Sequence, residues 1–188
     1  MKENTKGEKT KERIIECAAH LFLQKGYSAT GINEILSAAG LSKGSFYFYF
    51  TSKKELAIAV SEYFNRFKLN ELTKAAKNKT WAEFIETIVN DIMKRKPAYG
   101  CPFAVLGMET ALEVPDIALK SYESIKQAME IFEKVLIYSG LPEEKAAVNA
   151  ERIFAMYEGY LLLYRVSQDV NQLEKLKRDL LEFYDFIN

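Results

Sequence analysis

The sequence predicts an all-α protein of about nine helices. Apolar residues recur at the three- and four-residue spacing of helix faces along most of the chain, whereas the alternating pattern of strands does not occur. The four prolines and nine glycines among the 188 residues are few, and several of them mark breaks between periodic segments. Hydrophobic residues make up 48% and charged residues 28%, which is typical of a folded globular chain rather than a disordered one.

The expected helices follow from where each periodic segment begins and ends. Residues 1–9 are expected to form a loose, lysine-rich arm before a first helix over residues 11–25. Two short helices joined at Gly40 come next, and the hydroxyl of Ser52 can cap the fourth helix. The expected fourth to ninth helices run over residues 52–72, from 81 to before Pro97, from the corner 100–102 to 112, and over 116–138, 143–166 and 171–187.

The most diagnostic segment is TGINEILSAAGLSKGSFYFYF, residues 30–50. Its first helical pattern ends at Gly40, which can adopt the left-handed conformation that ends a helix. Ser42 can then cap a short second helix, in which Phe46 and Phe50 share one apolar face. The rest of that helix carries hydroxyls, aromatic rings and a cation. Two helices joined by a tight glycine turn predict a helix-turn-helix, whose second helix enters the major groove of DNA.

Three motifs surround this turn in a fixed order: IIxCAxxLFxxxGY at 14–27, TxxxEIxxAAGLSKG at 30–44 and FYxYFxSKxEL at 46–56. Together they resemble the DNA-binding domain of TetR/AcrR-family transcriptional repressors. Two positions depart from the family pattern, because Gly31 replaces a common threonine and Tyr49 a usual histidine. The resemblance implies a DNA-binding domain over residues 1–51 and a helical domain for ligand sensing and dimerisation over residues 52–188.

The zero net charge of the chain is an average over two unlike parts. Residues 1–54 hold nine basic and five acidic side chains, a net charge of +4, so the remainder holds seventeen and twenty-one, a net charge of −4. A basic N-terminal part would orient the molecule on DNA, although a solvated basic surface would look the same in composition. The motifs favour the DNA interpretation.

The expected DNA contacts follow from side-chain chemistry and from the family motif. Ser45 and Phe48 are expected at base edges, where a hydroxyl can bond either base class and a ring can pack on a thymine methyl group. Phosphate contacts position a protein without reading sequence. The residues expected to make them are Thr30, Lys43, Tyr47, Tyr49 and Lys53.

The last two expected helices carry a candidate dimer interface. The ninth has an apolar seam at steps of three and four, and small residues of the eighth, such as Ala155 and Gly159, let helices approach closely. Two recognition helices that read a palindrome need a twofold axis and half-sites roughly 34–36 Å apart. The resemblance implies a homodimer closed by a four-helix bundle; burial of both faces within one chain is the alternative. The expected interface residues are Ala147, Ala150, Phe154, Leu173, Leu176, Leu180, Phe183, Tyr184 and Ile187.

A regulated repressor also needs an effector site in its helical body. Methionine and aromatic side chains line pockets for apolar or planar ligands, with hydroxyls and an arginine to orient them, although the same stripes also form plain core. The residues expected near a ligand are Cys101, Phe103, Met108, Met129, Phe132, Met156, Tyr157, Tyr160, Tyr164 and Arg165.

Cys101 has a second interpretation as a reactive thiol. It lies at the expected start of a helix, downstream of Lys94, Arg95 and Lys96, and both features favour the nucleophilic thiolate. The Gly-Cys-Pro corner resembles one in a TetR-like branch whose members include responders to electrophiles or oxidants. A buried, inert thiol is the alternative, and Cys17 is expected to be such a core residue.

Other function classes have little support in the sequence. The single histidine, His20, lies off the apolar stripe of its helix without a visible catalytic partner, so neither an enzyme nor a metal or cofactor site is expected. No apolar run reaches transmembrane length, and the polar N-terminus is no signal peptide. Two cysteines suggest a reducing cytoplasm. The rival hypothesis is a helical module that binds a protein partner; otherwise the expected partners are double-stranded operator DNA, a second copy of the chain and a small-molecule effector.

Overall fold

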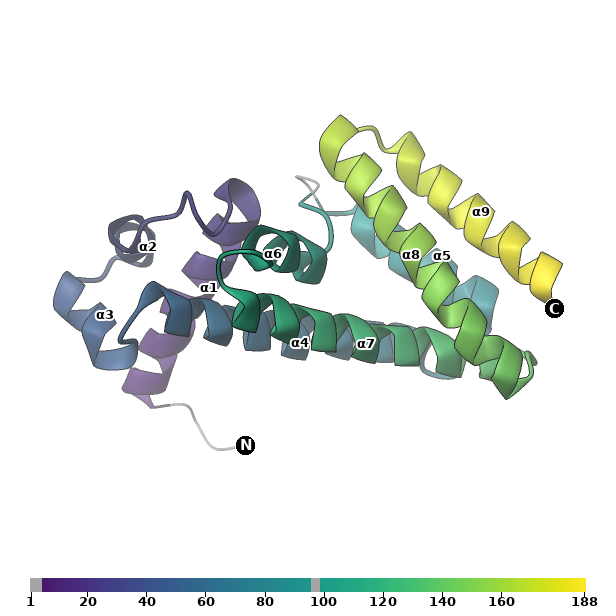
Figure 1. Ribbon diagram of the computed structural model, residues 1–188, viewed down its shortest axis with the longest axis horizontal. Coiled ribbons are helices and arrows are strands. Elements are labelled where there is room, and N and C mark those ends of the chain that lie inside the picture. The colour runs from purple at the N-terminus through teal and green to yellow at the C-terminus, as the bar shows by residue number, and fades with distance from the viewer. Residues whose placement is uncertain (1–4, 96–98) are drawn as a thin grey trace. The chain divides into compact units, whose positions relative to one another are not determined.

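The computed structural model describes residues 5–95 and 99–188, and within them the chain forms nine helices and no strands (Figure 1). The all-α prediction is therefore confirmed for the described residues. The helices are α1 (Lys6–Lys25), α2 (Ile32–Ala39), α3 (Lys43–Tyr49), α4 (Lys53–Ala76), α5 (Trp81–Met93), α6 (Pro102–Thr110), α7 (Pro115–Tyr138), α8 (Glu143–Ser167) and α9 (Asn171–Ile187).

The helices pack into two compact units. The first consists of the chain up to Arg66 together with Pro102–Glu123, and the second of Phe67–Cys101 together with Ser124–Asn188. Helices α4 and α7 each contribute residues to both units, and α6 belongs with α1 to α3. This division by packing leaves the functional boundary expected at residue 51 as a prediction.

The first helix begins earlier than expected because of a local capping motif. The hydroxyl of Thr5 accepts a hydrogen bond from the Glu8 N–H at 3.3 Å, and the Thr5 N–H donates to the Glu8 carboxylate at 2.6 Å. This reciprocal pair is a capping box, which stabilises the first turn by satisfying backbone donors that have no partner within the helix. The expected loose arm is therefore wrong for residues 5–9, while residues 1–4 lie outside the described chain.

The other helix ends agree with expectation within a few residues. The cap expected from Ser52 is present, because its hydroxyl accepts a hydrogen bond from the Glu55 N–H at 3.1 Å. Helix α4 continues to Ala76 rather than to residue 72, and α6 ends at Thr110 rather than at 112. Helix α5 ends at Met93, and Pro97, where it was expected to stop, lies outside the described residues.

The second unit is built around Trp81, the first residue of α5. Its side chain is 1% exposed, and the indole N–H donates to the backbone carbonyl of Leu180 in α9 at 3.1 Å. The ring stacks on Tyr184 at 6.1 Å between centroids and meets Phe132 of α7 edge-on at 5.9 Å. Trp81 thus joins three helices through its ring and satisfies its own polar atom, as buried tryptophans usually do.

Candidate nucleic-acid interface and effector pocket

The turn between α2 and α3 has the predicted geometry. Gly40 adopts the left-handed conformation with φ +62°, and its N–H donates to the carbonyls near the end of α2. The next N–H, of Leu41, donates to the Leu36 carbonyl at 2.9 Å, so two carbonyls at the helix end find partners. The side chain of Arg13 from α1 lies over Gly40, where an added Cβ would come within 3.1 Å of a guanidinium nitrogen. A glycine is therefore required here by conformation.

Helix α3 separates a buried face from an exposed one. Phe46 is 0% and Phe50 2% exposed, and their ring centroids lie 5.8 Å apart, so the expected core pair is confirmed. On the other side Tyr47 is 54% and Phe48 80% exposed. The Phe48 ring meets the Tyr49 ring edge-on at 4.9 Å between centroids, but most of it is left in solvent. It marks a surface that a partner can cover.

The remaining polar positions of α3 surround those two rings. Lys43 is exposed, and Ser45 and Tyr49 are half-buried. The hydroxyl of Tyr49 lies close to Gly7 at the start of α1, so this face of α3 is continuous with the first turn of α1. The cap expected from the Ser42 side chain is wrong, because its hydroxyl lies 3.2 Å from the Ser45 hydroxyl and makes no cap hydrogen bond to the described backbone.

Thr30 is placed differently from its expected role. Its side chain is 0% exposed, and its hydroxyl donates to the Gly26 carbonyl at 2.6 Å. The predicted phosphate contact from this hydroxyl is therefore wrong, because the group is buried and its proton is already donated within the protein. The signal missed in the sequence is the four-residue spacing from Gly26, which lets a threonine close the loop that follows α1.

Lys53 also makes contacts within the protein. Its ammonium lies 4.5 Å above the centre of the Tyr27 ring and donates to the Ser28 carbonyl at 3.3 Å. Burial lowers the pKa of Lys53, and the nearby charge of Glu109 acts in the opposite direction. Its phosphate contact stays a prediction, and any such contact must compete with these interactions.

Most of the expected dimer seam is buried inside a single chain. Leu173, Leu176 and Leu180 are each 0% exposed. Ala150 is 3% and Phe154 4% exposed, and Tyr184 donates to the Ser139 carbonyl at 2.7 Å. The five buried residues were wrongly assigned to a dimer interface, because the seam packs α9 onto α5 and α8. Of the other four, Ala147 is exposed, and Phe183, Tyr184 and Ile187 are half-buried.

The opposite face of α8 is exposed and mostly apolar, with Arg152 as a charged side chain at the same helical spacing. Val148 is 55%, Leu163 52% and Val166 78% exposed. Between them lies Gly159, around which the described residues leave at least 4 Å of open space. Steps of three, four and seven residues place these side chains on one side of the helix. We call this set the α8 face: Val148, Ala155, Gly159, Leu162, Leu163 and Val166.

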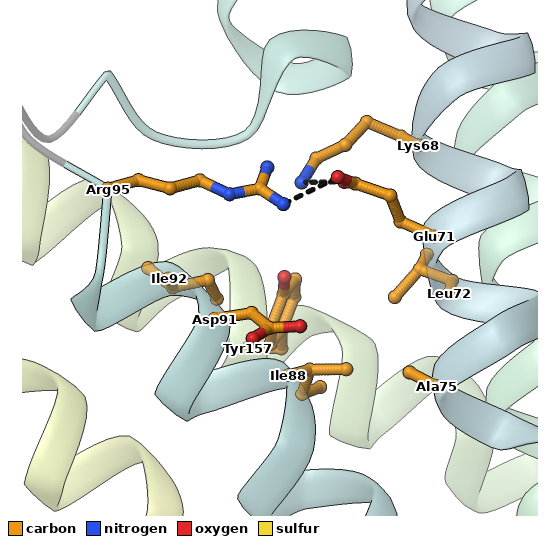
Figure 2. A pocket seen from close by; sticks show the side chains of 9 residues that line it. All are labelled: Lys68, Glu71, Leu72, Ala75, Ile88, Asp91, Ile92, Arg95 and Tyr157. Atoms are coloured by element: carbon orange, nitrogen blue, oxygen red, sulfur yellow. Dashed lines mark hydrogen bonds and ion pairs between the residues drawn. The ribbon is translucent and has the colours of Figure 1, made fainter.

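The second unit contains a small pocket between α4, α5 and α8, shown in Figure 2. Its empty volume is about 320 Å³, a figure that includes space open to solvent. Four aliphatic side chains and the ring of Tyr157 provide apolar surface, and four charged groups surround it. The lining residues are Lys68, Glu71, Leu72, Ala75, Ile88, Asp91, Ile92, Arg95 and Tyr157.

Among the residues expected near a ligand, only Tyr157 lines this pocket. Phe132 and Tyr164 are core residues at 0% and 4% exposure, and Phe103 and Met108 belong to α6 in the first unit. Methionine and aromatic stripes at helical spacing also build the core, and a ligand contact from the other nine expected residues stays a prediction. The other expected residues that do not line it are Cys101, Met129, Met156, Tyr160 and Arg165.

Three of the four charged groups of the pocket form a linked set, drawn with dashed lines in Figure 2. The Glu71 carboxylate accepts hydrogen bonds from Arg95 at 2.5 Å and from Lys68 at 3.1 Å. Burial acts to raise the pKa of Glu71, but these two cations outweigh it and the pKa lies below its usual value. Glu71 therefore stays ionised and holds both cations beside the aliphatic surface.

Glu158 is a buried carboxyl next to this set that was not among the site residues expected from the sequence. Burial raises its pKa to about 7, against the opposing effects of a hydrogen bond from Cys101 and the charge of Lys68. Its Oε1 atom is buried and has no hydrogen-bond partner among the described residues. The available signal was an acidic residue within the otherwise apolar segment from Phe154 to Leu163.

The surroundings of Cys101 differ from those expected for a reactive thiolate. The thiol is 8% exposed and hydrogen-bonded to the Glu158 carboxyl group. Burial and a neighbouring carboxylate both disfavour a second negative charge. Of the three expected cations, Arg95 is paired with Glu71 and Lys94 with Asp91, while Lys96 lies outside the described residues.

Two further expectations concern absences and surface positions. No cluster of three potential metal-ligating side chains occurs in the described part of the chain. None of its helices combines the length and the apolar character that a bilayer span requires. His20 is exposed, as expected, whereas Cys17 is only half-buried, and burial raises its pKa.

Comparison with known proteins assigns this architecture to a family. Residues 14–60 match the family model of bacterial regulatory proteins of the tetR family, and residues 79–179 match that of the C-terminal domain of LmrA/YxaF-like transcriptional regulators. The chain is 33% identical over 173 residues to an uncharacterised HTH-type transcriptional regulator in the lacX 3' region of Lactococcus lactis, covering 88% of each chain. It is 31% identical over 162 residues to the HTH-type transcriptional regulator LmrA of Bacillus subtilis, covering 82% of this chain and 85% of the relative.

The solved structures agree with the sequence comparisons. A TetR transcriptional regulator from Chloroflexus aurantiacus superposes with a TM-score of 0.81 at 30% identity, covering 95% of each chain. The matched segments include the helix-turn-helix and most of α5 to α9. The chain belongs to the TetR family of helix-turn-helix transcriptional regulators.

Proposed function

We propose that this regulator is a repressor that binds a palindromic operator as a homodimer and leaves it when a small-molecule effector binds. The observation that carries the proposal is the exposed face of α3, where Tyr47 and Phe48 stand in solvent while Phe46 and Phe50 anchor the helix. An aromatic surface kept in place by a buried pair suits a recognition helix in the major groove. The family membership supports DNA as its partner.

The chemistry of this face supports a division of roles. Lys43, Tyr47 and Tyr49 carry donors for phosphate oxygens, which fix the position of the helix on the duplex. Phe48 has no donor or acceptor, so its contribution to specificity is contact with an apolar base edge, of which the thymine methyl group is the main one. Ser45 lies on the same short helix and can bond either base class.

A homodimer would use the α8 face. Its aliphatic side chains are exposed, and Ala155 and Gly159 allow two copies of α8 to approach closely. A twofold interface buries the same surface on both subunits, so one such face per chain is sufficient. This corrected interface replaces the buried seam of α9.

The pocket of the second unit is the proposed effector site. Its aliphatic side chains and the Tyr157 ring suit an apolar or aromatic molecule, and the Lys68–Glu71–Arg95 set provides groups that orient polar substituents. Release from DNA is a population shift, and moving an equilibrium from 1:99 to 99:1 takes about 5.5 kcal/mol of differential binding. With one effector bound in each subunit, each effector would have to supply half of this free energy.

No catalytic activity and no cofactor form part of this proposal. The relatives are transcriptional regulators, and a protein that acts on the chromosome of a bacterial cell is proposed to work in the cytoplasm.

Selection of bound fragments from a library of duplexes tests the function. The full-length protein should enrich an inverted repeat whose half-site centres lie about one helical turn, roughly 34–36 Å, apart. Binding should weaken steeply with salt, because each neutralised phosphate releases counterions. A complex no more stable with the enriched duplex than with random DNA would contradict the proposal and favour a module that binds a protein partner.

Substitutions at Tyr47 and Phe48 separate positioning from base reading. Tyr47→Phe removes one phosphate donor and should weaken binding to all duplexes by a similar factor. Phe48→Ala should instead reduce the preference for the selected base, by about 1–3 kcal/mol at that position, with little effect on random DNA. Competition binding on duplexes with each base at each operator position provides the measurement. Equal losses on every sequence for both variants would show that the base-reading face is assigned wrongly.

Cys101 provides a test of covalent sensing against pocket binding. Because its thiol is buried beside a carboxyl group, it should react with iodoacetamide more slowly than an unfolded reference peptide. Mass spectrometry of the intact protein follows the reaction. We expect Cys101→Ser protein to release its operator normally with a pocket-binding effector, and loss of release in that variant would instead support a covalent mechanism.

A further inference from the structure

We infer that Glu109 of α6 is a positioning residue for the DNA-binding head. We use this name for helices α1 to α3, which are part of the first compact unit. Its carboxylate accepts a hydrogen bond at 2.5 Å from the backbone N–H of Tyr27, the second residue after α1. This contact joins positions 82 residues apart in the sequence, within one compact unit. The inference rests on the proposed function only in that its functional readout is DNA binding.

The contact needs the glycine at the end of α1. Gly26 has φ +93°, a conformation that disfavours side chains, and an added Cβ would overlap the Glu109 carboxylate. The carboxylate therefore lies directly against the backbone of Gly26 and Tyr27. A group in this position fixes the direction in which the chain leaves α1.

The segment held by Glu109 leads directly into the helix-turn-helix. We call residues 26–30 the junction. The Thr30 hydroxyl closes it on the Gly26 carbonyl at 2.6 Å, and α2 begins two residues later at Ile32. The Tyr27 ring is 9% exposed, with the Lys53 ammonium 4.5 Å above its centre. Because the junction is closed by its own hydrogen bonds, a shift at Tyr27 would move it and the start of α2 together.

The negative charge of Glu109 allows a positioning role to be distinguished from plain electrostatic repulsion of DNA. A carboxylate on a DNA-binding unit repels phosphate, so its removal should by electrostatics alone strengthen binding. If the carboxylate instead positions the junction, loss of its acceptor oxygen should weaken binding. Two interpretations of the same residue thus predict opposite results.

Three variants of the full-length protein separate these effects. Glu109→Gln and Glu109→Met have similar size and both lack the charge, but only glutamine retains an oxygen that can accept from the Tyr27 N–H. Glu113→Gln is the matched control, because Glu113 lies four residues away and acts on Tyr27 through its charge. Affinity is measured on the duplex enriched by the wild-type protein and on a random duplex.

Glu109→Met should bind the enriched duplex about tenfold more weakly than Glu109→Gln, within the usual range of coupling between distinct sites. Glu113→Gln should bind as tightly as the wild type or slightly more tightly. Equal affinities of Glu109→Met and Glu109→Gln for the enriched duplex would overturn the inference.

Hydrogen exchange provides a readout that does not depend on DNA. In the free protein the Tyr27 amide should exchange faster in Glu109→Met than in Glu109→Gln, while the urea midpoint of unfolding stays the same in both. Unchanged exchange at Tyr27 would overturn the inference even if operator binding fell. If the wild-type protein enriches no duplex, the proposed function fails, and the amide measurement still decides whether Glu109 holds the junction.

Discussion

Replacing Leu163 with arginine is expected to convert the proposed homodimer into monomers. Leu163 is 52% exposed and lies toward the C-terminal end of the α8 face, with Gly159 one turn before it. In a twofold interface each substitution enters twice, so two guanidinium groups would be desolvated without a carboxylate partner. An uncompensated buried charge costs about 3–5 kcal/mol, so the dissociation constant should rise about a thousandfold or more.

Sedimentation equilibrium on wild-type and Leu163→Arg protein measures this directly. Leu112→Arg is the matched control, because Leu112 is 98% exposed after α6 and outside the α8 face. The control should remain dimeric, and Leu163→Arg should also lose most of its operator affinity, because one head reads only half of a palindrome. A dimeric Leu163→Arg protein, or a monomeric control, would show that the α8 face is not the interface.

Replacing Glu158 with glutamine is expected to stabilise the protein above pH 7 and to reduce its pH dependence. Burial raises the pKa of this carboxyl group from 4.5 to about 7, so the folded state holds a proton that the unfolded chain releases. The stability contributed by the neutral carboxyl group is fully present below pH 4.5 and is lost as pH rises through about 7. At about 1.4 kcal/mol for each pH unit, the loss amounts to about 3 kcal/mol.

Urea unfolding at pH 5 and pH 8 tests this prediction. The wild-type protein should lose more stability between the two pH values than Glu158→Gln, because the amide is neutral at both. Glu151→Gln, at an exposed position of the same helix, should keep the wild-type pH dependence. The same difference between pH 5 and pH 8 in wild-type and Glu158→Gln protein would contradict the raised pKa.

The helix-turn-helix was predictable because its determinants are local. The left-handed glycine at 40 and the four-residue spacing of Phe46 and Phe50 act within one or two turns of helix. The errors in this region came from short-range polar contacts that compete with one another. Ser42 has a suitable side chain for a cap, and Thr30 for a phosphate contact, but each hydroxyl finds another partner in the folded unit.

The pocket could not be predicted, because its residues are distributed along the chain. Lys68 and Glu71 come from α4, Arg95 follows α5, and Tyr157 lies on α8. The spacing of methionines and aromatic residues identified apolar helix faces without identifying where the packing of those faces leaves space. The burial of Glu158 Oε1 without a hydrogen-bond partner among the described residues likewise arises only when α8 packs against its neighbours.

The sequence by itself determined the family, the helical class and the recognition helix, because these depend on motifs and on periodicity within single helices. Only the tertiary structure decided which apolar face meets another helix of the same chain and which is left for a partner. Periodicity shows that Leu173, Leu176 and Leu180 share a buried side, but burial has the same free-energy benefit against the protein's own α5 and α8 as against a second copy. For this reason the sequence shows that the seam of α9 and the α8 face are apolar, but only the tertiary structure shows which of them is buried within the chain.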